Sequence, residues 1–257
     1  MKENMQKNVT QTGSKVISMS LYGNYHRCIW GVIRNAQLIP ICLPEWTLRV
    51  YIAADPAPPH LAVPTRIVDK LKRMGAQIAK VSRANKMSPR NWRLLVGKDK
   101  HIDYFLVRDA DDRLSEREGA AVREWVSVAE QQSSVFHCIR DHPKHADQAI
   151  VDGLWGGRPR EIHQLLRQDI TQMMERGVSN LVTYINWSND MANFLNQVLW
   201  PAVRNSALCH DSVSPCDRWT KSSFRRPFPS SRIGQEYVGQ SLMHTISCSV
   251  TILISLM

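Results

Sequence analysis

The sequence predicts an α/β fold in which a mostly parallel central sheet carries helices on both of its faces. Short apolar runs typical of strands alternate with segments whose apolar residues recur every three or four positions, as in helices. The connections between them are short, which is typical of parallel strands joined by crossover helices. A chain of 257 residues with 43% apolar residues can bury a full core of this kind.

In the first half of the chain, strands are expected over residues 16–21, 48–53, 77–81 and 102–107. The last of these is the most apolar, and we place it at the centre of the sheet. Helices are expected over 28–37 and 65–74, and Gly75 is a natural stop for the second. Residues 82–100 form a basic connection that has room for a short helix.

In the second half, Ser115 and Glu118 fit a capping box at the start of an amphipathic helix. A strand is expected over 134–139, and Arg158-Pro159 opens a helix that runs to about 176. A strand over 181–185 and a helix over 189–199, ended by Pro201, complete the prediction. Beyond residue 203 the chain is expected to be rich in loops.

The net charge of +10 is unevenly distributed. Residues 1–100 contain 17 Lys and Arg against five Asp and Glu, and the remainder is nearly balanced. A basic first half favours an anionic partner. The segment from Arg66 to Lys100 is the most basic, and its simplest interpretation is a solvated face. No nucleic acid is expected as a partner, because no nucleic-acid-binding motif accompanies the charge.

The two ends of the sequence differ in character. Residues 1–15 are polar and are expected to be a disordered lead-in without a signal peptide. Residues 241–257 form an apolar tail that is too short for an ordinary transmembrane helix. Three interpretations of this tail remain open: a last strand, a weak anchor, or the out-of-place end of a truncated or misread gene. No transmembrane span is expected, and a cytoplasmic location is favoured.

An acidic cluster, Asp109-Ala110-Asp111-Asp112, follows the predicted central strand. Carboxylates one residue apart in a turn can converge on a cation, and oxygen ligands suit Mg²⁺ or Mn²⁺. Such an ion can neutralise a diphosphate as its bond to a sugar breaks. The alternative is an acidic turn that caps the helix beginning near Ser115.

Ligands of parallel α/β sheets sit at the carboxyl ends of the strands, so the loops after residues 21, 53 and 107 belong to one candidate site. Gly23 would let the backbone approach a ligand, Tyr22 can stack on a base, and Arg34 on the following helix can reach a diphosphate. An ordinary turn and a surface arginine are the simpler interpretations. The candidates for donor binding are Tyr22, Gly23, Arg27, Arg34, Asp55, Arg108 and Asp112.

Two later motifs are candidates for contact with an acceptor. Arg140-Asp141-His142-Pro143 follows a predicted strand, and Asp141 and His142 can bind hydroxyl groups. Trp155 can stack on a sugar ring, and Gly156 and Gly157 permit close approach. The competing interpretations are a structural turn for the first motif and a buried tryptophan beside a flexible turn for the second.

Taken in order, these motifs resemble a group of glycosyltransferases of the GT-A type. The resemblance rests on Tyr22-Gly23, Arg34-Asn35-Ala36, Arg108 to Glu118, Trp125, Arg140 to Pro143, Gly153 to Gly157, His210-Asp211-Ser212 and Phe228-Pro229. It spans about residues 16–240 and implies a GT-A-like, Rossmann-type sandwich. The implied donor half covers about 16–113 and the acceptor half about 114–240.

The resemblance also implies a function. The enzyme would use Mn²⁺ or Mg²⁺ to move a sugar from a nucleoside-diphosphate donor to a hydroxyl acceptor on a glycan, lipid or protein. It assigns Asp109 and Asp111 to the metal, although the neighbouring Asp112 leaves open which two carboxylates bind. It further implies His210 as a third ligand and Asp190 as the catalytic base, with Asp141 as a second catalytic candidate.

Two other functions stay open. A nucleotidyltransferase would need a glycine-rich, basic loop after the first strand, and residues 22–27 are poor in glycine. A catalytically inactive protein of the same fold could bind an anionic partner through the face formed by residues 66–100. The tail after residue 240 does not resemble the family, which bears on activity more than on fold.

Overall fold

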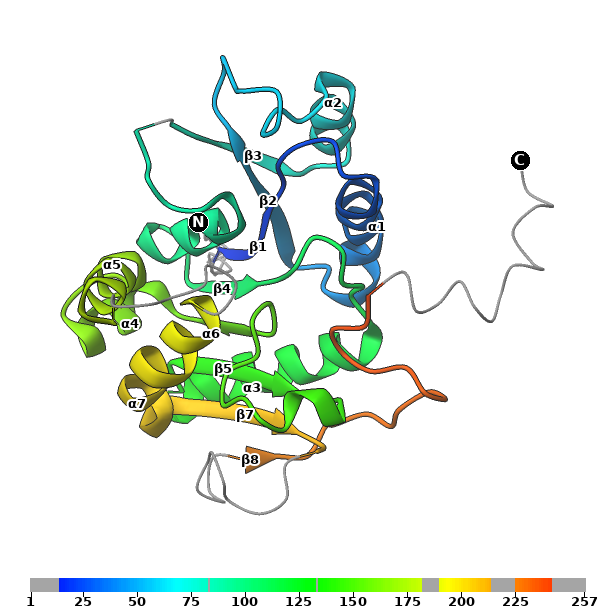
Figure 1. Cartoon of the computed structure of the whole chain (residues 1–257). Coiled ribbons are helices and arrows are strands. Elements are labelled where there is room, and N and C mark those ends of the chain that lie inside the picture. The colour runs from blue at the N-terminus through cyan, green and yellow to red at the C-terminus, as the bar shows by residue number, and fades with distance from the viewer. Residues whose placement is uncertain (1–13, 83, 133, 182–189, 214–224, 242–257) are drawn as a thin grey trace, which may run out of the picture.

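The computed structural model describes residues 14–82, 84–132, 134–181, 190–213 and 225–241. Its centre is an eight-stranded sheet in the order β3-β2-β1-β4-β6-β5-β7-β8 (Figure 1). The strands are β1 (Lys15–Ser20), β2 (Trp46–Ala53), β3 (Gln77–Val81), β4 (Tyr104–Val107), β5 (Phe136–Arg140), β6 (Trp155–Gly157), β7 (Ala207–Asp211) and β8 (Arg225–Arg226).

All neighbouring strands pair in parallel except at β6, which runs antiparallel to both β4 and β5. The α/β class with a mostly parallel sheet is therefore confirmed. Three strands, β6, β7 and the two-residue β8, were not predicted. In β6, two of the three residues are glycines and give no periodic signal, and β7 is a short run in the segment expected to be loops.

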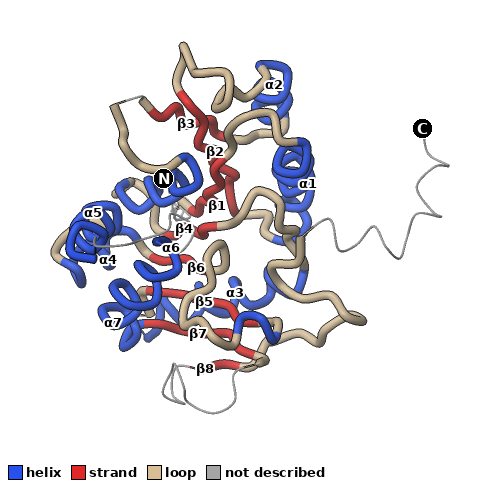
Figure 2. Tube along the Cα trace, in the orientation of Figure 1, coloured by secondary structure: helices blue, strands red, loops and turns tan. Residues whose placement is uncertain are grey.

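Helices cover both faces of the sheet, as Figure 2 shows. The longer elements are α1 (His26–Cys42), α2 (Thr65–Arg73), the 3-10 helix η1 (Pro89–Lys98), α3 (Glu116–Gln132), α4 (Pro159–Leu166) and α5 (Ile170–Leu181). The shorter ones are η2 (Pro143–His145), α6 (Asp190–Asn193), the π-helical η3 (Phe194–Leu199), α7 (Trp200–Val203) and η4 (Arg204–Ser206).

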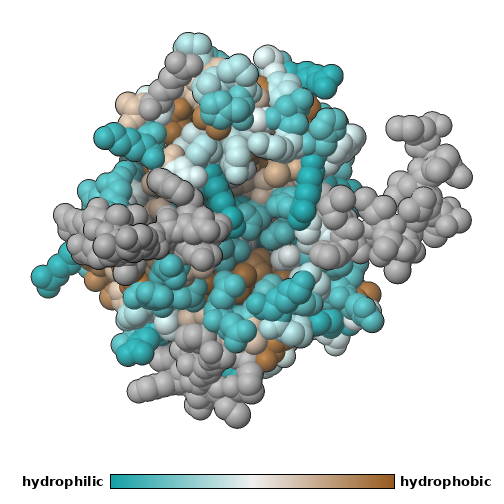
Figure 3. Space-filling view, in the orientation of Figure 1, coloured by the Kyte–Doolittle hydropathy of each residue, from teal (hydrophilic) through white to brown (hydrophobic). Residues whose placement is uncertain are grey.

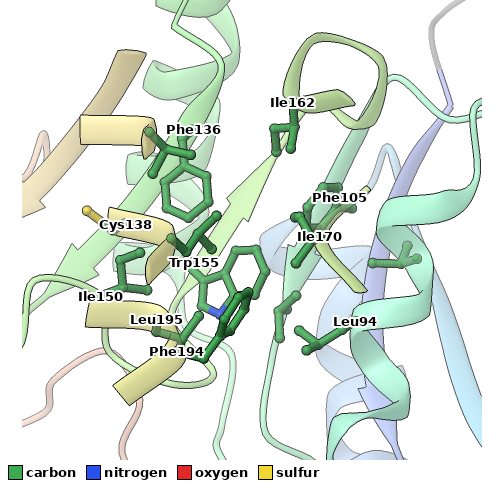
Figure 4. Close-up of a cluster of buried hydrophobic side chains, with 14 of the residues drawn as sticks. Leu94, Phe105, Phe136, Cys138, Ile150, Trp155, Ile162, Ile170, Phe194 and Leu195 are labelled. Atoms are coloured by element: carbon green, nitrogen blue, oxygen red, sulfur yellow. The ribbon is translucent and has the colours of Figure 1, made fainter. Parts of the chain in front are cut away.

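The sheet has a hydrophobic core on each face, because adjacent residues of a strand point to opposite sides. Phe105 of β4 belongs to the core beneath η1, α4, α5 and η3. Its neighbour Leu106 belongs to the other core, beneath α1, α2 and α3. Figure 4 shows part of the first core, with Trp155 between Phe136 and Phe194. Burial on both faces explains why these strands are continuously apolar.

Three helix and strand predictions need correction or lie outside the described residues. The helix expected from 158 to 176 is two helices, separated at Arg167, whose backbone is left-handed, and at Asp169, which caps α5. The helix expected to end before Pro201 continues as α7, with Pro201 in its first turn, where a missing N–H is tolerated. The strand expected over 181–185 falls almost wholly outside the described residues. No described helix is long and apolar enough to cross a membrane.

Helix α1 packs directly on the acidic turn that follows β4, and Gly31 is the point of contact. A Cβ atom at this position would overlap the carbonyl oxygen of Ala110 and would lie 2.7 Å from the Cα of Asp111. Both neighbours are backbone atoms, which cannot swing away as a flexible side chain would. The absence of a side chain at Gly31 therefore sets how closely α1 approaches this turn.

We expect Gly31→Ala to lower the free energy of unfolding by about 2 kcal/mol, because the methyl group forces the helix and the acidic turn apart. Thermal or urea unfolding measures the change. Gln37→Ala, on the exposed side of the same helix, is the control and should change stability by less than about 0.5 kcal/mol. Equal stability of Gly31→Ala and the wild type would contradict this account of the contact.

Candidate functional site

A cleft of about 410 Å³ lies at the carboxyl ends of β1 and β4, where a parallel sheet is expected to hold its ligand. The face of the molecule seen in Figure 3 is largely hydrophilic, in contrast to the cores beneath it. Charged side chains dominate the lining of the cleft. The lining residues are Ser20, Tyr22, Arg27, Cys28, Arg90, Arg93, Asp109, Ala110, Asp111 and Asp112.

Arg93 pairs with the first carboxylate of the acidic cluster. Its guanidinium contacts Asp109 with one terminal nitrogen and Asp152 with the other, the latter at 2.6 Å. Arg90 reaches the same Asp152 at 3.0 Å. Within the described part of the chain, the Nε of Arg93 has no hydrogen-bond acceptor. The side chain is only 3% exposed, so Arg93 contributes a nearly buried positive charge beside the cleft.

Arg93 was missed by the sequence analysis, which placed it within a solvated basic face. Its sequence neighbours Trp92 and Leu94 are apolar and are buried with it. These two apolar neighbours were the signal in the sequence that could have indicated a buried arginine. Its backbone is also anchored to β1. The hydroxyl of Ser18 donates to the carbonyl of Arg93 at 2.7 Å, and the N–H of Arg93 donates to the hydroxyl of Ser20 at 2.8 Å.

Arg27 pairs with the second carboxylate of the cluster. Its Nε lies 2.6 Å from Asp111, and its Nη2 donates to the hydroxyl of Ser241 at 2.6 Å. Half of the Arg27 side chain is exposed. The structure thus places Arg27, one of the predicted donor-binding residues, at the cleft, between the acidic cluster and the last described residue of the chain.

Of the three carboxylates, Asp112 is the one whose negative charge is least compensated by neighbouring positive charges. Burial and the negative charges of Asp109 and Asp111 raise the pKa of Asp112 to about 8. Three acidic residues in one turn therefore repel one another even with two arginines beside them. A cation in the cleft would relieve this repulsion.

The predicted metal ligands do not come together as a set. Across the described ranges, no three His, Cys, Asp or Glu side chains form a group that could hold a metal ion. His210 is completely buried in β7, where its ring bonds to His137 at 2.8 Å and to Glu124 at 3.1 Å. These contacts give His210 a role within the core and correct its assignment as a metal ligand.

Two predicted donor-binding residues near the first strand line or border the cleft. Tyr22 lies edge-on to Trp92, with ring centroids 6.4 Å apart. Gly23 has a φ of +65° and lies close to the carbonyl oxygen of His60, so a side chain there would be both strained and crowded. Gly23 thus shapes the turn that presents Tyr22.

Three other residues predicted to bind the donor lie away from the cleft. Asp55 is exposed and pairs with Lys80 at 2.7 Å on the surface. Arg34 is exposed and contacts Gln37 of its own helix. Arg108 is buried in an ion pair with Glu118, and its Nη1 donates to the carbonyl of Trp155 at 2.9 Å. None of the three lines the cleft.

Asp141 is a structural anchor, which corrects its assignment as a catalytic residue. Its carboxylate is fully buried and accepts hydrogen bonds from Arg117, Ser212, Arg232 and the backbone N–H of Val238, at 2.7 to 3.1 Å. Burial alone would raise its pKa, but the hydrogen bonds from Arg117 and Ser212 lower the pKa of Asp141 below the ordinary 3.8. A carboxylate held this way is a poor proton acceptor.

The prediction that Trp155, Gly156 and Gly157 contact an acceptor does not fit their burial. Trp155 is fully buried, stacked on Phe136 with centroids 5.4 Å apart and edge-on to Phe105 (Figure 4). Its ring has no free face for a sugar, and Gly156 and Gly157 are buried in β6 beside it. Their missing side chains permit close approach of strands, because a Cβ at Gly156 would collide with the carbonyl of Phe105.

His142 and Asp190 complete the predicted residues. His142 lies outside the cleft and lines a second cavity, of about 520 Å³. The backbone of Asp190 begins α6, as predicted, but its side chain is not among the described ones. Its role as a base stays a prediction.

Comparison with known proteins gives weak structural similarity only. No family model matches the chain, and no curated protein matches it. A mannosyltransferase from Pyrobaculum calidifontis, solved with GDP-Man and Mn²⁺, has a TM-score of 0.42 at 12% identity, covering 60% of this chain and 46% of that one. Glucosyl-3-phosphoglycerate synthase from Mycobacterium tuberculosis, solved with phosphoglyceric acid, has a TM-score of 0.36 at 12% identity, covering 58% of each chain.

A third structure is 4-diphosphocytidyl-2C-methyl-D-erythritol synthase from Anaerococcus prevotii, with a TM-score of 0.40 at 8% identity, covering 72% of this chain and 84% of that one. The chain spans about half the length of the two glycosyltransferases. All three TM-scores are below 0.5, so the likeness carries no functional information.

We expect Asp141→Asn to lower the free energy of unfolding by about 3 kcal/mol at pH 7, because it leaves the partly buried Arg117 and Arg232 without their counter-charge. The folded-state pKa of Asp141 is depressed, so its contribution is present above the ordinary pKa of 3.8 and is lost as pH falls through the folded-state value. The deficit of the variant should therefore shrink below about pH 4.

Urea unfolding of wild type and variant between pH 3 and pH 8 measures this dependence. Glu130→Gln, an exposed charge change on α3, is the control and should cost less than about 0.5 kcal/mol throughout. A deficit for Asp141→Asn that stays constant down to pH 3 would contradict the assignment.

Proposed function

We propose that this protein is a glycosyltransferase that takes a sugar from a nucleoside-diphosphate donor and passes it to a hydroxyl acceptor. One observation carries the proposal. The cleft at the carboxyl ends of β1 and β4 combines three carboxylates with three arginines in about 410 Å³. This volume falls in the range of small-molecule sites, and a metal–diphosphate complex matches both kinds of charge.

The carboxylates favour a divalent cation. Asp109 and Asp111 supply oxygen atoms, which Mg²⁺ and Mn²⁺ prefer, and each side chain is about one-quarter exposed toward solvent. Burial and, after it, the negative charges of Asp109 and Asp111 raise the pKa of Asp112, so the three carboxylates lie close enough to share one cation. Asp109 and Asp111 would therefore hold the ion, and the ion would offset the charge that builds on the leaving diphosphate.

The arginines favour the phosphates. Arg27 and Arg90 are each half exposed and can turn toward a ligand, whereas Arg93 is fixed by its two carboxylates and by β1. Guanidinium groups suit phosphate oxygens because their donors form a planar fork. A cation on the acidic cluster would weaken the hold of Asp111 on Arg27, and Arg27 would then be available to the diphosphate.

Two further residues, Tyr22 and Asp190, have roles in the proposed reaction. Tyr22 lines the same cleft and offers an aromatic face to a nucleobase. Asp190 begins α6 and is the candidate base that takes the proton from the acceptor hydroxyl. A nucleotidyltransferase would be expected to cradle the triphosphate with a glycine-rich loop, and the loop after β1 contains only Gly23.

We expect UDP or GDP to bind in the presence of Mn²⁺, and Asp109→Asn and Asp111→Asn each to weaken this binding by about tenfold or more, a loss of about 1.4 kcal/mol. Removing the ion with EDTA should have a similar effect on the wild type. Isothermal titration calorimetry measures both, and Glu130→Gln provides the matched control for loss of one carboxylate.

Wild-type affinity in both aspartate variants would rule out the metal assignment. Product analysis with a panel of UDP-, GDP- and CDP-sugars then separates the reaction types. A glycosyltransferase releases the nucleoside diphosphate, whereas a nucleotidyltransferase run in this direction consumes pyrophosphate and releases a sugar phosphate. Binding of polyanions without any nucleotide affinity would support an inactive binding protein instead.

A further inference from the structure

A second cavity, of about 520 Å³, lies between the turn after β5 and the last described segment of the chain. His142 and Lys144 come from the first of these segments, and Arg232, Gln235, Tyr237 and Gln240 come from the second. The volume is that of a small-molecule site. Apart from His142, a predicted acceptor contact, this cavity plays no part in the site described above.

The cavity is positively charged. Lys144 and Arg232 line it, and no acidic side chain is among its lining residues. Lys144 is exposed and has no ion-pair partner among the described residues. Arg232 uses Nη2 to bind Asp141 and Ser212, so one edge of its guanidinium is committed and its side chain is about one-third exposed. The carboxylate of Asp141 is compensated separately by Arg117.

An aromatic wall bounds the cavity on one side. The rings of His142 and Tyr237 lie 4.1 Å apart and are tilted by 36°, and His145 packs beside both. Burial lowers the pKa of His145 to about 4, so this ring is neutral at pH 7 and adds no charge. The wall is a surface on which the carbon skeleton of a polyol could lie, next to the two cations.

The cavity adjoins the cleft that we propose for the donor. Asp112 lines the cleft, and its charge acts with burial to raise the pKa of Tyr237, which lines the cavity. The backbone N–H of Arg113 donates to the carbonyl of Gln240 at 3.1 Å, and Ser241 pairs with Asp112 as an isolated bridge. These contacts join a residue that lines the cleft, Asp112, to the segment that lines the cavity.

From the proposed function and this placement we infer that the cavity binds the acceptor, and that the acceptor is a hydroxyl compound carrying a phosphate group. A phosphate monoester has nearly two negative charges at pH 7, which match Lys144 and Arg232. The aromatic wall would hold the hydroxyl-bearing part of the molecule, and the contact at Asp112 would direct a hydroxyl toward the donor.

The experiment uses the full chain with glycerol 3-phosphate as the probe and glycerol as the phosphate-free reference. We expect calorimetry to detect glycerol 3-phosphate but not glycerol, and Lys144→Glu to weaken binding by about tenfold or more. Lys72→Glu, the same charge reversal at an exposed site on α2, should bind as the wild type does.

Unchanged affinity in Lys144→Glu, or an equal loss in Lys72→Glu, would overturn the inference, and so would equal binding of glycerol. Acetate at the same concentration tests whether any small anion suffices, and binding as tight as that of the phosphate would overturn the choice of phosphate. Thermal unfolding checks that both variants are folded.

Two further binding measurements, one with vesicles and one with nucleotide, separate this inference from alternatives. Vesicles of phosphatidylcholine with and without phosphatidic acid distinguish a free phosphate from a lipid headgroup, and in either case the inference requires that Lys144→Glu weaken the binding by about tenfold or more. UDP or GDP with Mn²⁺ should bind Lys144→Glu as tightly as the wild type. Nucleotide binding without phosphate binding defeats this inference alone, whereas Lys144-dependent phosphate binding without nucleotide binding defeats the proposed function and leaves only an anion site.

Discussion

The bridge from Arg93 to Asp109 and Asp152 fixes the geometry on which the cleft depends. A nearly buried guanidinium is costly unless its charge is paired, and the two terminal nitrogens of Arg93 each contact a carboxylate, so the position of the side chain is tightly specified. Asp109 follows β4 and Asp152 precedes β6, and the backbone of Arg93 is held by two serines of β1. One side chain thereby links the elements that form the inner wall of the cleft.

A similar charged anchor holds the other half of the molecule. Asp141, at the end of β5, gathers Arg117 from α3, Arg232 from the last described segment and the backbone of Val238. Val238 also packs in a small apolar cluster with Leu154 and Ile139. This segment returns to the acidic turn at Ser241, so the anchor at Asp141 places the wall between the cleft and the second cavity. Each half of the sheet thus uses a carboxylate–arginine contact to position a loop.

The positions of the first four strands along the chain could be predicted because their patterns are strong. Continuous apolar runs, helical spacing between them and short connections leave few topologies for the first half. Strand β6 could not be predicted from its own residues, since Trp155 and two glycines are selected by packing against Phe105 and Phe136, which are distant in sequence. The π-helical turn in η3 and the break at Arg167 likewise depend on tertiary contacts.

The residues of the candidate site likewise include some that the sequence could predict and some that it could not. Asp109, Asp111 and Asp112 could be found because three carboxylates after an apolar strand are a local signal. Arg93 could not be separated from the surrounding basic residues, because its distinguishing property is burial. Conversely, Arg108, Asp141 and Trp155 lie in motifs that look functional, and the fold uses all three internally.

These internal uses explain why charged motifs are ambiguous in a sheet of this kind. The carboxyl ends of parallel strands are where ligands bind, and they are also where the chain must turn and satisfy its backbone groups. Asp109 and Asp141 both follow strands, but Asp141 has all its bonding capacity taken by protein donors, whereas Asp109 shares one arginine and keeps an exposed edge. Spare bonding capacity at the strand end distinguishes a group available to a ligand from one that holds the fold. Among the described residues, the acidic turn after β4 lines the cleft and Lys144 lines the second cavity, and both offer charge to a ligand.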